Sequence, residues 1–394
     1  MNDMKEFTLI SNIDLYTPHK HIPGGAILVQ GDKILYAGAQ NSVPDFARKE
    51  GQSIVSPNGL IAVPGFVDIH LHGGGGADFM DASFDAVTKI LKTHLKKGTT
   101  SALPTLMTAS RGKILRAIKA VLETKKEGKG IPDILGLHLE GPYIAKEKRG
   151  AQPEKHIRPF CSKEMDSYLK ASERSIKIMT FAPEIPTAGA LIRYLKRKKI
   201  VAAAGHSNAN FAQALKGIRA GIGHGTHLFN AMSGIFHRDP GLAGALLIDD
   251  GVTVELIADG VHLHPAMLRL ITRIKPLDKI ILVTDATRFA GRNKTPSRTE
   301  DGKLCGSVIT LDLALKNMVK WTGLPLTDIL PMLTFNPSRL LGIENRKGVL
   351  KKGADADIVL LDRGLNVKAV FFRGKPILGN KPLGNRGNEE KITP

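Results

Sequence analysis

Histidine and carboxylate side chains recur where short apolar segments of this sequence end. Five ends carry them: His70-Leu71-His72, His138-Leu139-Glu140, Gly205-His206-Ser207, the stretch with His224 and His227, and Thr284-Asp285-Ala286. Alternate residues of a β-strand point to the same side, so the two imidazoles of the first end should share a face, as should the imidazole and carboxylate of the second. Imidazoles and carboxylates without thiolates suit Zn(II), Fe(II), Mn(II) or Co(II), and the sequence does not choose among these metals.

Each of these histidines, taken alone, has a simpler explanation. A single histidine at a strand end is more often a hydrogen-bonded core residue than a ligand, and an isolated His-x-His pair is a weak motif. Their recurrence at the ends of successive segments favours a metal site, in which Glu140, His206 and His227 hold one divalent ion. Four other histidines are expected to be solvated in loops or on helix surfaces: His19, His21, His94 and His156.

A second metal ion has its own candidate ligands. His70 and His72 could hold it, sharing Glu140 with the first ion, and Asp285 is a further candidate ligand. The fourth apolar segment runs into Phe181-Ala182-Pro183-Glu184 and offers no lysine for a bridging carbamate. A carboxylate must therefore do any bridging, and Glu140 is the candidate. The sequence predicts one or two divalent metals per subunit.

The elements that would position these residues alternate regularly. Eight apolar segments are separated by helical patterns: 66–69, 100–103, 134–137, 176–181, 200–204, a weak one at 222–228, 252–257 and 280–283. Ser83 and Ser110 are expected N-caps of two of the helices. This alternation predicts an α/β fold with a closed (β/α)8 TIM-like barrel. An open doubly wound sheet is the alternative, but the glycines at 73–76 lack the spaced dinucleotide-binding pattern.

Both ends of the chain contain strand-like segments without the helical patterns that separate the eight central segments. Residues 26–36 contain a hairpin signal around Gly31-Asp32, and residues 357–361 and 367–372 also resemble strands. We expect a small discontinuous β-sandwich domain formed by residues 1–62 and 347–394. The barrel would then span residues 63–346.

Charge and composition restrict the class of protein. The 394 residues include 56 basic and 37 acidic side chains, for a net charge of +19. The basic residues are scattered over helical segments without interleaved aromatics, which favours solvated helix faces over nucleic-acid binding. No apolar run is long enough for a bilayer, no signal peptide is evident, and the only cysteines are Cys161 and Cys305. We expect a cytoplasmic protein without a membrane or nucleic-acid partner.

Several longer motifs resemble one known family. These are the stretch from Pro64 to Gly73, His138-Leu139-Glu140-Gly141-Pro142-Tyr143, Gly205-His206-Ser207, Thr226 to Met232, Pro240 to Gly244, Ala258-Asp259-Gly260-Val261-His262, and the closing stretches Asn336-Pro337-Ser338 and Gly353 to Asp357. The first resembles the opening barrel strand of the amidohydrolase superfamily. Together they resemble its N-acetylglucosamine-6-phosphate deacetylase family over essentially the whole chain.

The resemblance implies roles for individual residues. Glu140, His206 and His227 would be metal ligands, with His70 and His72 allowing a second ion, and Asp285 would be the catalytic acid and base. The expected substrate contacts are Ala151, Gln152, Asn230, Ala231, Arg238 and His262. Some family members carry a histidine where this chain has Gln152. The resemblance also implies a homodimer, in which Arg238 could contact the phosphorylated amino sugar bound by the neighbouring subunit.

Other functions are compatible with parts of the pattern. Another amidohydrolase activity, such as cyclic amide hydrolysis, deamination or deacetylation of a related amino-sugar phosphate, shares the barrel and the metals. A barrel that has lost catalysis is a weaker alternative, because it would have no need for five converging ligands. A nucleic-acid binder is motivated by the charge alone.

Overall fold

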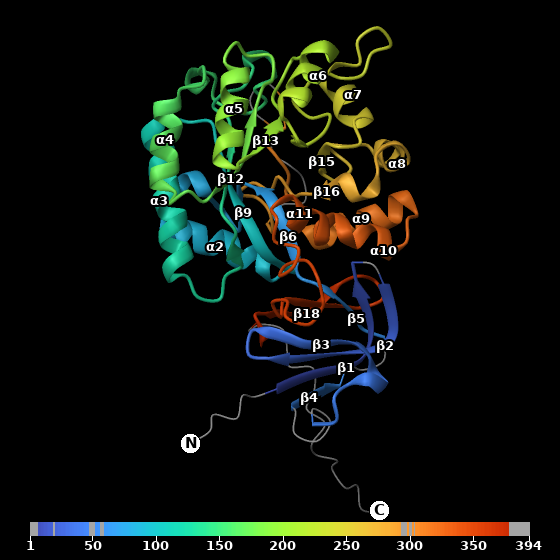
Figure 1. Cartoon of the computed structure of the whole chain (residues 1–394). Coiled ribbons are helices and arrows are strands. Elements are labelled where there is room, and N and C mark those ends of the chain that lie inside the picture. The colour runs from blue at the N-terminus through green and yellow to red at the C-terminus, as the bar shows by residue number, and fades with distance from the viewer. Residues whose placement is uncertain are drawn as a thin grey trace, which may run out of the picture.

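The chain folds into a parallel barrel and a separate sheet that lies below it in Figure 1. The computed structural model describes residues 7–18, 20–46, 52–55, 59–292, 298, 302 and 304–377. The expectation for His19 lies outside the described residues, as does much of the basic segment 288–303.

Eight parallel strands form the barrel, in agreement with the predicted fold. They are β6 (Phe66–Leu71), β9 (Thr99–Met107), β11 (Leu137–Glu140), β12 (Ile176–Phe181), β13 (Val201–Ala204), β14 (His224–Gly225), β15 (Thr253–Leu256) and β16 (Ile280–Leu282). Each pairs with its neighbour in this order, and β10 (Asp133–Ile134) adds to the other end of β9. A parallel bridge between Leu71 and Ala286 brings the last segment back to β6, so the barrel is nearly closed.

Helices surround these strands, as the parallel connections require. They are α2 (Phe84–Leu95), α3 (Arg111–Glu127), α4 (Ser162–Ala171), α5 (Ala188–Lys198), α6 (Phe211–Ala220), α7 (Gly241–Ile248), α8 (Pro265–Ile274), α9 (Leu311–Thr322), α10 (Leu326–Ile329) and α11 (Phe335–Leu340). Ser83 and Ser110 cap α2 and α3 as predicted, each accepting a backbone N–H bond. In the described part of the chain, no helix is long and apolar enough to cross a membrane.

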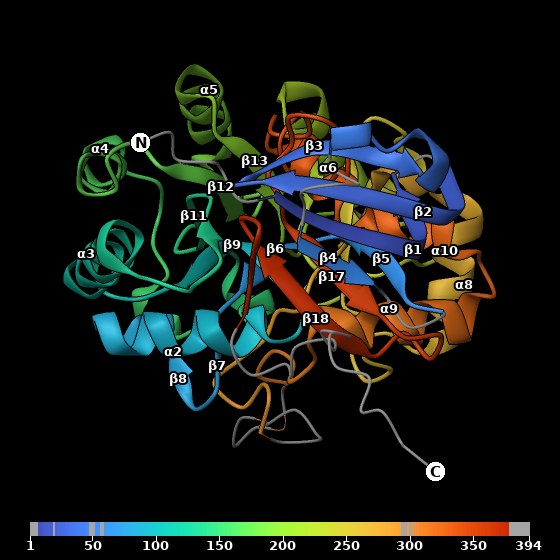
Figure 2. The same cartoon turned by 90° about the horizontal axis from the view of Figure 1, so that it is seen from below.

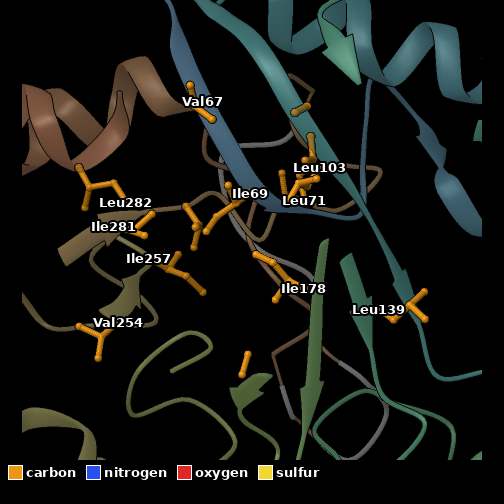
Figure 3. Close-up of a cluster of buried hydrophobic side chains, with 14 of the residues drawn as sticks. Val67, Ile69, Leu71, Leu103, Leu139, Ile178, Val254, Ile257, Ile281 and Leu282 are labelled. Atoms are coloured by element: carbon orange, nitrogen blue, oxygen red, sulfur yellow. The ribbon is translucent and has the colours of Figure 1, made fainter. Parts of the chain in front are cut away.

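Strand β6 shows how the barrel divides its side chains. Val67, Ile69 and Leu71 are fully buried in the main hydrophobic cluster, together with residues of other strands and of the helices (Figure 3). The alternate positions, Asp68 and His70, are polar and equally buried. This strand is buried on both faces, with apolar side chains on one face and polar, ionisable side chains on the other.

The separate sheet is built from both ends of the chain, as the terminal patterns predicted. Its strands are β1 (Phe7–Thr17), β2 (Lys20–Gln30), β3 (Lys33–Ala39), β4 (Gln52–Val55), β5 (Ile61–Pro64), β17 (Ile358–Leu361), β18 (Val367–Phe372) and β19 (Lys375–Pro376). Figure 2 shows the early and late strands side by side, and β5 pairs antiparallel with β17. The predicted division between residues 62 and 63 falls inside β5. The domain boundaries therefore stay a prediction.

A buried lysine joins this sheet to the barrel. The Lys347 ammonium lies 2.6 Å from Asp357 and 2.9 Å from Asp355, and it also contacts Asp133 of β10. Burial alone would lower the pKa of Lys347, but the carboxylates of Asp357 and Asp133 outweigh it and raise the pKa above its usual value. Breaking such a buried ion cluster leaves uncompensated charge, so the cluster holds the two parts together.

Candidate active site

The carboxyl ends of the barrel strands open into one cavity of about 790 Å³. Its lining includes His72, Glu140, His206, His227 and Asp285, which come from five different strand ends. Residues far apart in sequence are therefore gathered at one mouth of the barrel, as the alternation of strands and helices predicted.

Glu140, His206 and His227 form a tight group at the base of this cavity. The Oε1 atom of Glu140 lies 2.9 Å from Nε2 of His206 and 3.0 Å from Nε2 of His227, and the two Nε2 atoms are 3.2 Å apart. His206 places Nδ1 2.9 Å from the carbonyl oxygen of Lys148. A neutral His206 therefore donates from Nδ1 and turns the lone pair of Nε2 toward the carboxylate. Facing lone pairs need a cation between them.

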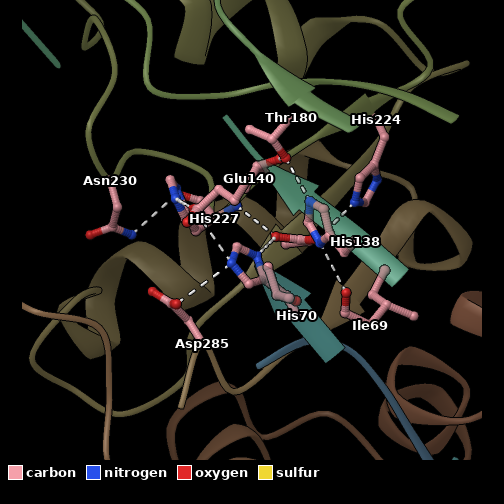
Figure 4. A network of polar contacts seen from close by, with 12 residues as sticks. Ile69, His70, His138, Glu140, Thr180, His224, His227, Asn230 and Asp285 are labelled. Atoms are coloured by element: carbon pink, nitrogen blue, oxygen red, sulfur yellow. Dashed lines mark hydrogen bonds and ion pairs between the residues drawn. The ribbon is translucent and has the colours of Figure 1, made fainter. Parts of the chain in front are cut away.

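His70, His72 and Asp285 form a second group beside the first. Nε2 of His72 lies 3.1 Å from Oδ1 of Asp285 and 3.2 Å from Nε2 of His70. Glu140 lies between the groups, with one carboxylate oxygen 3.4 Å from His70 and the other 3.4 Å from His72. Figure 4 shows Glu140, His70 and Asp285 pointing toward one another. The predicted sharing of Glu140 is thus geometrically available.

The charges of these groups agree with a cation site. Burial would lower the pKa of His72, but hydrogen bonds to Asp285 and Glu140 outweigh it and raise the pKa to about 10. Burial would raise the pKa of Glu140, but the neighbouring His206 and the hydrogen bonds to the site histidines hold it well below its usual value. The cluster therefore attracts positive charge strongly, and its nitrogen and oxygen donors fit divalent metals.

Three of these residues adopt backbone conformations that side chains rarely take. The φ angle is +47° at His206, +31° at His227 and +46° at Asp285. Residues other than glycine in this region are strained, and such strain gathers at functional sites. The backbone turns sharply at the strand ends and thereby aims these side chains into the cavity.

His138 lies at a strand end but is not placed as a ligand. Its Nδ1 atom is 3.1 Å from the carbonyl oxygen of Ile69, and its Nε2 atom is 2.7 Å from the hydroxyl of Thr180. Burial, followed by the positive charge of His70, lowers the pKa of His138 to about 3. A neutral imidazole with both nitrogens occupied links β11 to β6 and β12, which is the simpler explanation considered for each histidine.

All but one of the predicted substrate-binding residues line the cavity. Ala151, Gln152, Asn230, Ala231 and His262 line the cavity. Gln152 donates to Oε2 of Glu140 at 2.6 Å and accepts from the backbone N–H of Thr108, so it also holds the carboxylate in place. Arg238 is exposed and is not among the residues that line this subunit's cavity.

His262 is held by a neighbouring carboxylate. Its Nδ1 atom lies 2.7 Å from Oδ2 of Asp259. Burial would lower the pKa of His262, but the hydrogen bond to Asp259 outweighs it and raises the pKa. His262 also lines the cavity, so the contact with Asp259 fixes a ring that faces the proposed substrate position.

Several residues near the site were not predicted. Glu255 is fully buried behind His70, and its signal was a lone carboxylate inside the apolar segment 252–257. Asp68 lies inside the barrel and accepts from the Thr284 hydroxyl at 2.6 Å. Lys148, Arg288 and Arg298 add positive charge to the cavity lining.

One interpretation of the histidines was wrong. His94 is fully buried on α2, with Nε2 2.9 Å from the carbonyl oxygen of Gly73, so it supports the glycine turn that follows His72. It lies three and four residues after Leu91 and Ile90, on the apolar stripe of the helix. His21 is exposed as expected, although it lies in β2, and His156 is half-buried.

The chain is similar in sequence and in fold to several known proteins. The family model described as the amidohydrolase family matches residues 61–377. The chain is 36% identical over 391 residues to N-acetylglucosamine-6-phosphate deacetylase of Bacillus subtilis (strain 168), covering 94% of this chain and 97% of that protein. It is 34% identical over 337 residues to N-acetylgalactosamine-6-phosphate deacetylase of Escherichia coli O157:H7, covering 82% and 89%. The solved N-acetyl-D-glucosamine-6-phosphate deacetylase of Mycobacterium smegmatis superposes with a TM-score of 0.86 at 32% identity, covering 95% and 100%.

Proposed function

Because this chain belongs to the amidohydrolase family, we propose that it hydrolyses the acetamide of N-acetylglucosamine 6-phosphate to glucosamine 6-phosphate and acetate. The observation that carries the proposal is the pair of ligand groups joined by Glu140 at the base of the cavity. A relative that covers nearly the full length of both chains bears the name of this activity. The reaction is the hydrolysis of a linear amide.

The proposed metal ligands are Glu140, His206 and His227 for one ion, with His70, His72 and Asp285 available for a second. A divalent ion held by these residues would supply a water with its pKa lowered to roughly 7 and a positive charge close to the amide carbonyl. The proposed cofactor is Zn, Fe, Mn or Co, with one or two ions per subunit.

The chain's own residues supply the proton transfers. Asp285 accepts a proton from the attacking water and passes it to the leaving nitrogen, because its carboxylate faces the cavity next to His72. His262 donates from Nε2 to the acetyl oxygen, where negative charge develops, and Asp259 keeps its ring in that orientation. Burial would raise the pKa of Asp285, but the hydrogen bond to His72 lowers it, so the base is ionised.

The sugar phosphate would be held farther out. Asn230, Ala231 and Ala151 lie on the cavity wall. We propose that Arg238 reaches the phosphate of a neighbouring subunit in a homodimer, because it is exposed and lies next to Ile235 and Phe236, whose surfaces are 50% and 70% exposed. Apolar side chains so exposed are expected at an interface between copies. The cytoplasmic location stays a prediction.

A second substrate is supported by a specific observation. A relative from Escherichia coli O157:H7, at a similar identity, bears the name N-acetylgalactosamine-6-phosphate deacetylase. The two sugars differ in the configuration of one hydroxyl group, so kcat/KM measured on both decides which of them the cavity accepts. Cyclic amides and deaminase substrates belong in the same assay as negative controls.

The proposed function is tested by acetate release from N-acetylglucosamine 6-phosphate, measured with and without a chelator. We expect metal-replete protein to release acetate and chelated protein to lose that activity, with recovery when a divalent metal returns. Elemental analysis of the same samples should show metal content falling in parallel. Hydrolysis that persists after complete metal removal would contradict the proposal.

A further inference from the structure

Glu255 lies directly behind the site and is not a member of either ligand group. It belongs to β15, is fully buried, and accepts three hydrogen bonds. Its Oε2 atom lies 2.8 Å from Nδ1 of His70 and 3.0 Å from the backbone nitrogen of His227, and its Oε1 atom lies 3.0 Å from Nε2 of His224. A buried carboxylate is tolerated when it is paired in this way.

The contact with Glu255 determines which nitrogen His70 presents to the cavity. An ionised carboxylate only accepts, so Nδ1 of His70 carries the hydrogen and Nε2 of a neutral ring carries a lone pair. That lone pair faces Nε2 of His72 at 3.2 Å and Oδ1 of Asp285 at 3.5 Å. Without an acceptor behind it, His70 could adopt the other tautomer and point a hydrogen at Asp285.

His70 differs from two of the other site histidines in this respect. His72 bonds through Nδ1 to the carbonyl oxygen of Thr105, and His206 bonds through Nδ1 to that of Lys148. Backbone carbonyls are present whatever the side chain. The orientation of His70 therefore depends on a side chain, and a mutation can remove it.

We infer that Glu255 is the positioning residue that creates the second metal position, defined by His70, His72 and Asp285. It does so by fixing the tautomer and orientation of His70, whereas it reaches the position defined by Glu140, His206 and His227 through one backbone N–H, that of His227. Carboxylates that hold a ligand histidine typically contribute 10–100-fold to metal affinity. The inference rests on the proposed metal-dependent function and adds a residue to it.

The test counts metal ions rather than turnovers. Wild type, Glu255→Gln and Glu255→Leu are stripped, titrated with Zn(II) and analysed for bound metal per subunit. We expect wild type to bind two ions. The second should bind about 10-fold more weakly in Glu255→Gln, whose carbonyl still accepts, and about 100-fold more weakly in Glu255→Leu. Affinity for the first ion should fall less, because Glu255 contacts that position only at the backbone N–H of His227.

Glu164→Gln is the matched control. Glu164 is a buried glutamate that accepts from Arg158 and two tyrosines but contacts none of the proposed ligands. This variant should keep two ions even though it loses stability. If Glu255→Leu does not fold, Glu255→Gln decides, because unchanged binding of the second ion in it would overturn the inference.

A double variant tests the route of the effect. If Glu255 acts through His70, then His70→Ala with Glu255→Gln should bind metal as His70→Ala does, with no further loss. A further loss in the double variant, or a single ion in wild type, would contradict the inference. Acetate release is measured separately, so a failed deacetylase assay with the expected metal counts refutes the substrate and leaves the role of Glu255 standing.

Discussion

At the scale of single residues, backbone carbonyl oxygens orient two of the site imidazoles. Thr105 and Lys148 accept from Nδ1 of His72 and His206, which leaves each Nε2 aimed at the carboxylates. Both acceptors belong to the backbone of the barrel strands and their loops. The site is therefore organised by the barrel itself, and little reorientation is needed when an ion binds.

Asp285→Asn tests the acid–base role. The amide cannot take up the proton from water, so kcat should fall by about 10²–10⁴-fold. Metal content is measured on the same preparation, because Asp285 is also a candidate ligand. Metal retained with more than a few per cent of wild-type kcat would show that the carboxylate is structural.

The predicted site residues share one property that the sequence reveals. His70, His72 and Glu140 occupy alternate positions at strand exits, so the period of a strand predicted their common face. Glu255 and His94 were missed because their roles depend on what lies behind them in three dimensions. The position of His94 on the apolar stripe of α2 does indicate its burial, but the bonding partners of the two side chains cannot be obtained from spacing along the chain.

At the scale of elements, helix α4 is tied to the active-site side of the barrel by one buried glutamate. Glu164 accepts from Arg158 at 2.7 Å, from Tyr168 at 2.8 Å and from Tyr143 at 2.9 Å. Tyr143 follows the end of β11, only three residues after Glu140. The network therefore joins a helix to the segment that carries the shared ligand.

Glu164→Gln should lose stability in a pH-dependent way. Burial would raise the pKa of Glu164, but hydrogen bonds from Arg158, Tyr168 and Tyr143 outweigh it and lower the pKa. Its contribution, about 1.5–3 kcal/mol for hydrogen bonds to a charged group, is therefore present above the unfolded pKa of roughly 4.5 and is lost as pH falls. Thermal melts of both proteins should differ near neutral pH and converge in acid.

Strand β14 was the barrel strand that the sequence pattern predicted least clearly. Strand β14 has two residues, His224 and Gly225, where the sequence offered a weak apolar segment at 222–228. Its short pairing with β13 and β15 is imposed by the closed barrel. The apolar segment 100–103 predicted part of β9, which extends from Thr99 to Met107, whereas β14 depends on its neighbours.

At the scale of the whole molecule, Arg238 tests the proposed homodimer. We expect Arg238→Ala to raise KM for the phosphorylated sugar much more than for an unphosphorylated analogue, because its guanidinium matches phosphate oxygens. Mixing Arg238→Ala with Asp285→Asn should restore low-KM activity, since a mixed dimer pairs an intact Asp285 with the partner's intact arginine.

If the mixed dimers do not recover activity, Arg238 contacts the substrate phosphate bound in its own subunit. Equal effects of Arg238→Ala on the two substrates would exclude phosphate contact altogether. Subunit exchange is verified by tagging one variant and recovering the other with it.

The antiparallel pairing of β5 with β17 has a consequence for biosynthesis. Ile61 pairs with Leu361, so the edge of β5 has no partner until about 300 further residues have left the ribosome. Pairings this distant in sequence form slowly, and unpaired strand edges are prone to aggregate. The first strands of the nascent chain are therefore prone to aggregate until β17 has been synthesised. Truncation shortly before residue 358 should produce insoluble protein, even though such a chain contains every barrel strand.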